Sequence, residues 1–134
     1  TTAHHASFKP VVVHEFGHSF GGLADEYFYE SGDVLDATYS LNHEPWEANL
    51  TTLVDFNSKW ADMMPDGIER PTKPTDERKA NYTVGLYEGR GYQTKGIYRP
   101  AVVCRMRDNA SERFCPVCER NLERVILHHL LPQE

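Results

Sequence analysis

Two histidines and a glutamate beside the first of them are the residues of this chain best suited to chemistry. His14 and His18 stand four positions apart, so on a helix their imidazoles project from one face, one turn apart. At that spacing both rings can reach a single zinc ion at about 2.0–2.1 Å. Glu15 can take a proton from a water molecule at the open coordination position as that water attacks a carbonyl. The pattern therefore predicts a zinc hydrolase with Glu15 as its general base.

A catalytic zinc ion of this kind needs a third protein ligand, and the residues after His18 offer one. Gly21 stands three positions beyond the histidine, where a sharp turn can lead the chain back toward the metal. Asp25 is the expected third ligand and Glu26 the alternative, with the remaining carboxylate available as a hydrogen-bond partner near the site. In the competing interpretation, both are solvated acidic residues on a loop.

The residues around this motif carry a family resemblance. Residues 14–27 (HEFGHSFGGLADEY) resemble the signature of the IgA-peptidase family, zinc peptidases named for bacterial proteases that cut immunoglobulin A. The similarity extends to residues 84–89 (VGLYEG), 98–100 (YRP), 104–107 (CRMR) and 114–118 (FCPVC). The chain therefore resembles a peptidase family over most of its length.

More broadly, the chain resembles the metzincins, in which a glycine turn delivers the third ligand and a methionine from a later turn lies beneath the metal. The resemblance implies that His14 and His18 bind zinc and that Glu15 is the catalytic base. It also makes Gly21 the turn glycine and Met106 the candidate for the methionine turn. Without the resemblance, Met106 is equally an ordinary core residue.

Two features depart from the metzincin pattern. The common third ligand stands three residues after the glycine, and that position is Ala24, which cannot bind a metal. Asp25 or Glu26 must replace it, and a carboxylate in place of a histidine makes zinc a weaker Lewis acid. Metzincin-like peptidases also have a twisted sheet before the active helix, for which residues 1–13 are too short. We therefore expect residues 1–134 to be the C-terminal part of a catalytic domain, with an upstream segment of the same precursor as a candidate partner.

Three cysteines lie in the C-terminal third of the chain. A disulfide from Cys104 to Cys115 or Cys118 is the expected arrangement, and it would clip the last helix to the segment before it. The C-x-x-C spacing also resembles a redox pair or half of a structural zinc site, whose further ligands would come from Cys104, His128 and His129. A bridge implies an oxidising environment, so a secreted or otherwise extracytoplasmic bacterial protein is expected.

Two helices are predicted to position these residues. Residues 7–20 form the first, with Ser7 as N-cap and Gly21-Gly22 as its end. Residues 116–131 form the second, which is amphipathic; its apolar face carries Leu122, Val125, Ile126 and Leu130. Between them we expect a helical turn at 59–64, an exposed loop at 65–79 and a strand or turn within 82–92. The expected fold class is α+β and metzincin-like, mainly helices and loops.

Composition narrows the partners. The net charge of −6 comes with no basic stripe, which argues against nucleic acid, and no apolar run is long enough to span a membrane. The expected function is a zinc-dependent endopeptidase that cleaves extracellular proteins, with a protein or peptide as substrate. One alternative is a catalytically inactive zinc-stabilised binding module. Another is a small redox or disulfide-bonded interaction domain built around the CPVC run.

Overall fold

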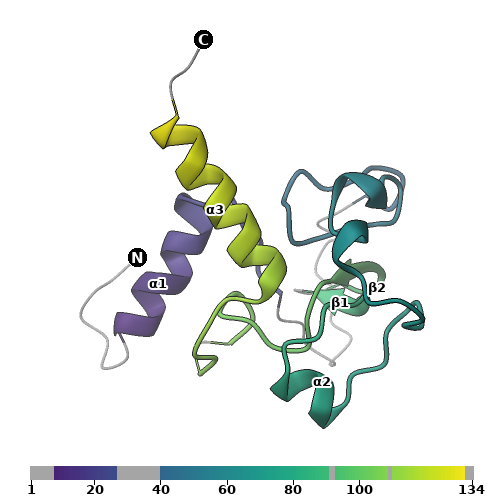
Figure 1. The fold of residues 1–134 in the computed structure, drawn as a ribbon. Coiled ribbons are helices and arrows are strands. Elements are labelled where there is room, and N and C mark those ends of the chain that lie inside the picture. The colour runs from purple at the N-terminus through teal and green to yellow at the C-terminus, as the bar shows by residue number, and fades with distance from the viewer. Residues whose placement is uncertain (1–7, 27–39, 91–92, 109, 132–134) are drawn as a thin grey trace.

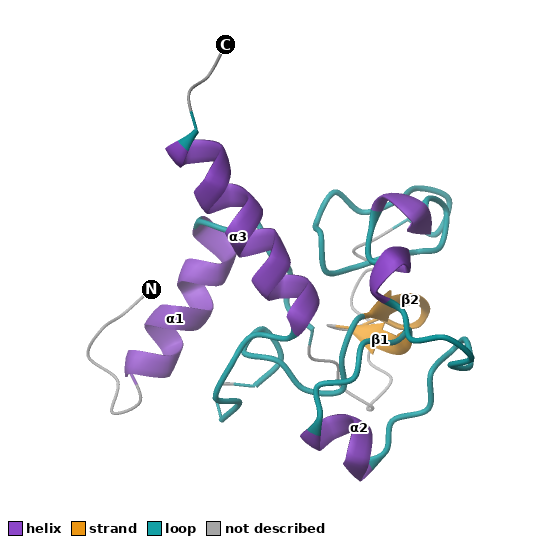
Figure 2. Cartoon of the chain, viewed as in Figure 1, coloured by secondary structure: helices purple, strands orange, loops and turns teal. Residues whose placement is uncertain are grey.

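Two helices lie side by side at one end of the molecule, and a small sheet with loops lies at the other (Figure 1). The computed structural model describes residues 8–26, 40–90, 93–108 and 110–131. The long helices are α1 (Phe8–Ser19) and α3 (Pro116–Leu130). The remaining elements are short (Figure 2): the 3-10 turns η1 (Phe56–Ser58) and η2 (Ala61–Met63), helix α2 (Asp76–Ala80), and strands β1 (Tyr87–Arg90) and β2 (Gln93–Arg99). This agrees with an α+β class; the metzincin-like arrangement stays a prediction.

Helix α1 ends where its sequence predicts. Gly22 adopts a left-handed φ of +62°, and its N–H donates to the His18 carbonyl at 3.0 Å, which is the glycine cap expected after the last helical turn. Gly21 serves a different purpose, because a Cβ there would lie 2.7 Å from Leu122 Cδ2. The Asn121 side chain also donates to the Gly21 carbonyl at 2.7 Å. Helix α3 is therefore fastened to the turn that follows α1.

Helix α3 begins as predicted, with Cys115 as N-cap and Pro116 in its first turn, where a missing N–H is harmless. Leu122 packs against the core. Farther along, Ile126 and Leu130 are 45% and 74% exposed. The predicted apolar face is thus buried only near its start, because the end of α3 extends beyond the packed part of the molecule (Figure 1). No described helix is long and apolar enough to cross a membrane.

The core gathers residues from every part of the described chain. Trp60 is fully buried at its centre, and its indole N–H donates to the Gly85 carbonyl at 2.8 Å. Its other buried members are Leu23, Phe56, Val84, Leu86, Ala101, Cys104, Met106, Cys115, Val117 and Cys118. All three cysteines therefore lie in the hydrophobic core.

The middle of the chain departs from the sequence-based expectations in two places. The loop predicted for residues 65–79 ends in helix α2, because the Thr75 hydroxyl accepts from Arg78 N–H at 3.1 Å and acidic Asp76 and Glu77 fill the first turn. Strand β2 was not predicted at all. It pairs antiparallel with β1, and Tyr98 also exchanges backbone hydrogen bonds with Thr51, so one partner is its neighbour in the sequence and the other lies much earlier in the chain.

Candidate metal centre

Three ligand atoms converge beside α1. His14 Nε2 and His18 Nε2 lie 3.0 Å apart. Asp25 Oδ1 lies 3.0 Å from the first nitrogen and 3.1 Å from the second. All three side chains are partly buried. The structure therefore brings together the two predicted histidines and the preferred third ligand.

Backbone carbonyls determine which ring nitrogens face this cluster. His14 Nδ1 donates to the Arg105 carbonyl at 2.9 Å, and His18 Nδ1 donates to the Leu23 carbonyl at 2.7 Å. Because a carbonyl oxygen can only accept, each Nδ1 carries a proton and each Nε2 of a neutral ring presents a lone pair. Two lone pairs and a carboxylate oxygen thus point at one small volume, an arrangement that attracts a cation. Without an ion, the hydrogen bond that protonated His14 donates to the Asp25 carboxylate raises the pKa of His14, and partial burial opposes that rise.

The loop after α1 separates Asp25 from Glu26. Asn49, which is fully buried, accepts from Ala24 N–H at 2.9 Å and donates to the Ala24 carbonyl at 2.8 Å. Ala24 consequently packs into a small core cluster with Leu50 and Ile97. Asp25, one residue later, reaches the histidines. Glu26 is fully buried elsewhere, and its N–H donates to the Met106 carbonyl at 3.0 Å.

Met106 lies directly against α1. A Cβ placed on Gly17 would come within 2.5 Å of Met106 Sδ, so the sulfur packs against α1 at Gly17. Met106 is fully buried and belongs to a turn in which Arg107 N–H donates to the Cys104 carbonyl at 2.9 Å. A methionine turn beneath the metal stays a prediction.

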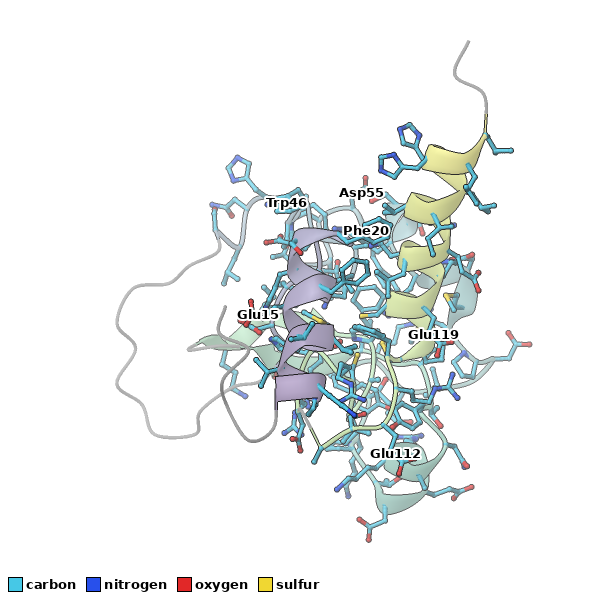
Figure 3. All side chains as sticks on the ribbon, turned by 90° about the vertical axis from the view of Figure 1, so that its left-hand side faces the viewer. Glu15, Phe20, Trp46, Asp55, Glu112 and Glu119 are labelled. Carbon is cyan, nitrogen blue, oxygen red and sulfur yellow. The ribbon has the colours of Figure 1, made fainter. Side chains whose placement is uncertain are left out.

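Glu15 projects from α1 on the side away from α3, whereas Phe20 lies between the two helices (Figure 3). With His18 and Ser19, Glu15 lines a surface hollow of about 440 Å³ whose apolar wall is formed by Val12 and Phe16. Both wall residues are exposed. The expected general base therefore faces an open hollow that it shares with one of the histidines.

The cysteines differ from the expected disulfide. All three are free and buried, and Cys104, Cys115 and Cys118 converge with Glu26. Burial raises the pKa of the Cys104 thiol to about 12 and that of Cys118 well above its usual value. Burial also disfavours the Cys115 thiolate, but hydrogen bonds from the two neighbouring thiols lower the pKa of Cys115 to about 6. Burial likewise raises the pKa of the Glu26 carboxyl well above its usual range.

Two other histidines considered from the sequence do not join either cluster. His128 and His129 lie in the last turn of α3 and are exposed, so they are not the further ligands that a C-x-x-C zinc site would need. Sequence reasoning missed Glu26 in that role, because nothing in the local pattern connects residue 26 with residues 104–118.

A family model described as IgA Peptidase M64 matches residues 2–82 and 75–126. The chain belongs to the IgA peptidase M64 family. No curated protein matches it. Family membership makes this M64 chain a peptidase, a hydrolase whose substrate is a protein or peptide, and it agrees with the resemblance seen in residues 14–27.

The donor set of this M64 peptidase fits a zinc ion. Imidazole nitrogen and carboxylate oxygen are ordinary zinc ligands, and a tetrahedral ion with bonds of about 2.0 Å separates its ligand atoms by about 3.3 Å. The three observed separations are 3.0–3.1 Å. Three protein ligands leave one position open, which is the composition of a catalytic site and not of a structural one.

Proposed function

We propose that this M64 peptidase is a zinc-dependent endopeptidase in which His14, His18 and Asp25 bind the metal and Glu15 is the general base. The observation that carries the proposal is the convergence of two imidazole Nε2 atoms and one carboxylate oxygen within 3.1 Å of one another. Glu26 is the weaker candidate for third ligand, since it is buried among the cysteines.

Glu15 would move the protons of the reaction. When bound, zinc supplies Lewis acidity, which polarises a peptide carbonyl and makes water more acidic. The Glu15 carboxylate takes a proton from the attacking water and passes it to the amine nitrogen of the leaving group. Its place beside His18 on the hollow puts this carboxylate where a substrate chain can reach it.

Other residues orient the ligands. The carbonyls of Arg105 and Leu23 keep the two Nδ1 atoms protonated, so that the Nε2 atoms remain free to bind metal. Asn49 holds the backbone at Ala24 and thereby keeps Asp25 in reach. The exposed faces of Val12 and Phe16 give the substrate an apolar surface next to the base. Cleavage of extracellular proteins, and secretion of this peptidase, stay predictions.

The test is a peptide-library digest combined with metal analysis. We expect cleavage that a chelator abolishes and added zinc restores. Glu15→Ala and Glu15→Gln should bind as much zinc as the wild type and lose activity by on the order of 10²–10⁴-fold, the usual contribution of a general base. Glu123, an exposed glutamate on α3, provides the matched control, and Glu123→Ala should leave activity unchanged.

The outcomes separate the proposal from its rival. Substantial hydrolysis by Glu15→Ala would remove Glu15 as the base. If the chain binds zinc through the histidines but no peptide is cut in a chelator-sensitive manner, the zinc-stabilised binding module is the better description. If His14→Ala and Asp25→Ala bind zinc as the wild type does, the metal centre itself is wrong.

A further inference from the structure

A second group of potential ligands lies in the core, apart from the three residues beside α1. Cys104, Cys115, Cys118 and Glu26 each contribute one ligand atom, and these atoms all lie within 4.8 Å of one another. All four residues are buried to at least 99% of their surface. Four convergent ligands with no solvent access form a closed site, whereas the histidine site has three ligands and an open hollow beside it.

Three separate segments build this second group: the loop with Glu26, the turn with Cys104 and the start of α3. Cys104 opens the turn that carries Met106, since Arg107 N–H and Asp108 N–H both donate to the Cys104 carbonyl. Cys115 is the N-cap of α3 and Cys118 lies in the first turn of that helix, where the helix dipole favours a thiolate. Cys115 N–H points at Cys104 Sγ, 3.1 Å away, and such a bond stabilises a negatively charged sulfur.

One oxygen of the buried Glu26 carboxyl group lacks a hydrogen-bond partner in the described core. Its Oε1 is buried without a hydrogen-bond partner among the described residues, and its Oε2 lies 3.9 Å from Cys118 Sγ. A buried carboxyl group either stays neutral or, when charged, is paired or coordinates a metal, and a metal ion would hold Glu26 in its charged form. The charge of the buried Arg99 guanidinium lowers the pKa of Glu26, and Arg99 Nη1 donates to the backbone carbonyls of Glu88 and Gly89.

We propose that Cys104, Cys115, Cys118 and Glu26 bind a structural zinc ion. Three sulfurs and one oxygen make a four-ligand set, and the C-x-x-C spacing is typical of half of such a site. Zinc–sulfur bonds of about 2.3 Å place tetrahedral sulfurs about 3.8 Å apart, which the observed clustering within 4.8 Å allows with small adjustments. On binding, each thiol releases its proton to solvent, and Arg99 partly balances the net negative charge.

The second ion would hold the proposed catalytic site together. Glu26 follows Asp25 directly, and its N–H is bonded to the Met106 carbonyl. One ion would therefore join the start of α3, the Met106 turn and the loop that carries Asp25. This consequence rests on the proposed function, but binding of the second ion does not.

The test measures metal content and ligand type in the whole chain, purified under reducing conditions. We expect two zinc ions per chain. After replacement with cobalt(II), the wild type should show an intense near-ultraviolet sulfur-to-cobalt charge-transfer band, because only thiolate ligands produce it. His14→Ala should lose one ion and keep this band. Cys104→Ser and Glu26→Gln should lose the ion responsible for the band, and Ser111→Ala, beside the same segment, should retain both ions.

The wild-type measurements keep the proposal testable even if a core variant fails to fold. A single ion with no charge-transfer band overturns it. Fewer than three thiols titrating in denaturant overturns it in favour of a disulfide. Three thiols that react only after a chelator is added support it. If the band is present but no chelator-sensitive cleavage occurs, the structural ion is supported while the proposed peptidase mechanism fails.

Discussion

Replacing Gly17 with alanine probes the contact between α1 and the Met106 turn. The new Cβ would lie 2.5 Å from Met106 Sδ and 3.2 Å from Phe114 Cε1. Met106 is fully buried, so its side chain must shift within the core to make room. Overpacking of this kind costs about 1–3 kcal/mol, whereas alanine gains about 1 kcal/mol over glycine in a helix. We expect Gly17→Ala to lower the free energy of unfolding by up to about 2 kcal/mol.

The sign of the effect should reverse when the sulfur is removed. Met106→Ala alone should cost about 2–5 kcal/mol, because it leaves a cavity beneath the helix. In that background the Gly17→Ala clash is gone and only the helix preference remains. Gly17→Ala should then stabilise by up to about 1 kcal/mol, a coupling of about 1–3 kcal/mol between the two positions.

Urea unfolding followed by far-ultraviolet circular dichroism measures all four corners of this cycle. Free zinc must be held constant, because bound metal adds to apparent stability. A loss of 1 kcal/mol should also lower Tm by about 4 °C for a chain of this length. Ser19→Ala, at an exposed position of α1, controls for a substitution outside the core and removes only the exposed bond from Ser19 Oγ to the Glu15 carbonyl. Equal costs of Gly17→Ala in both backgrounds, within about 0.5 kcal/mol, would refute the contact as the cause.

Three other perturbations test the metal centre. Asp25→Asn should weaken zinc binding by more than about 100-fold, which exceeds the effect of losing a hydrogen-bond partner outside the ligand set. If competition with a chromogenic chelator finds a change of less than about 10-fold, Asp25 is not a ligand. The hydrogen bond to Asp25 raises the pKa of His14, while burial opposes the rise, so protons should compete with zinc above pH 6.5. Zinc affinity measured from pH 8 to pH 6 should therefore fall progressively, and a flat profile contradicts this. Asn49→Ala leaves two buried backbone groups of Ala24 unpaired and should lower the free energy of unfolding by about 2–5 kcal/mol. Asn121 is only partly buried, so Asn121→Ala should lower it by about 0.5–1.5 kcal/mol. Similar losses for the two variants in thermal unfolding contradict this ranking.

Sequence reasoning succeeded where the information was local. The four-residue spacing of His14 and His18 and the glycines after them predicted both α1 and its end, because a helix and its cap are decided by near neighbours. Pro116 and the apolar period after it predicted α3 for the same reason. Asp25 was preferred over Glu26 from the residues alone, and the distances in the structure favour the same choice.

The rest depends on contacts between distant segments. Strand β2 is recognisable only through its pairing with β1 and Thr51. A disulfide from Cys104 to Cys115 or Cys118 was expected because it needs no other kind of residue. The fold adds Glu26, which stands 92 positions before Cys118. His128 and His129 were nearer in sequence to the cysteines, but the length of α3 carries them away from the core.

The His18 ring is held at both of its nitrogens by one short loop. Its Nδ1 donates to the Leu23 carbonyl, and its Nε2 faces the Asp25 carboxylate. If this loop lifts, the ring loses its support and the ion loses a ligand in the same motion. Departure of the metal and opening of the loop then become a single event. A chelator at high concentration would have to wait for that opening, so the rate of metal extraction would reach a plateau set by the chain and no longer by the chelator.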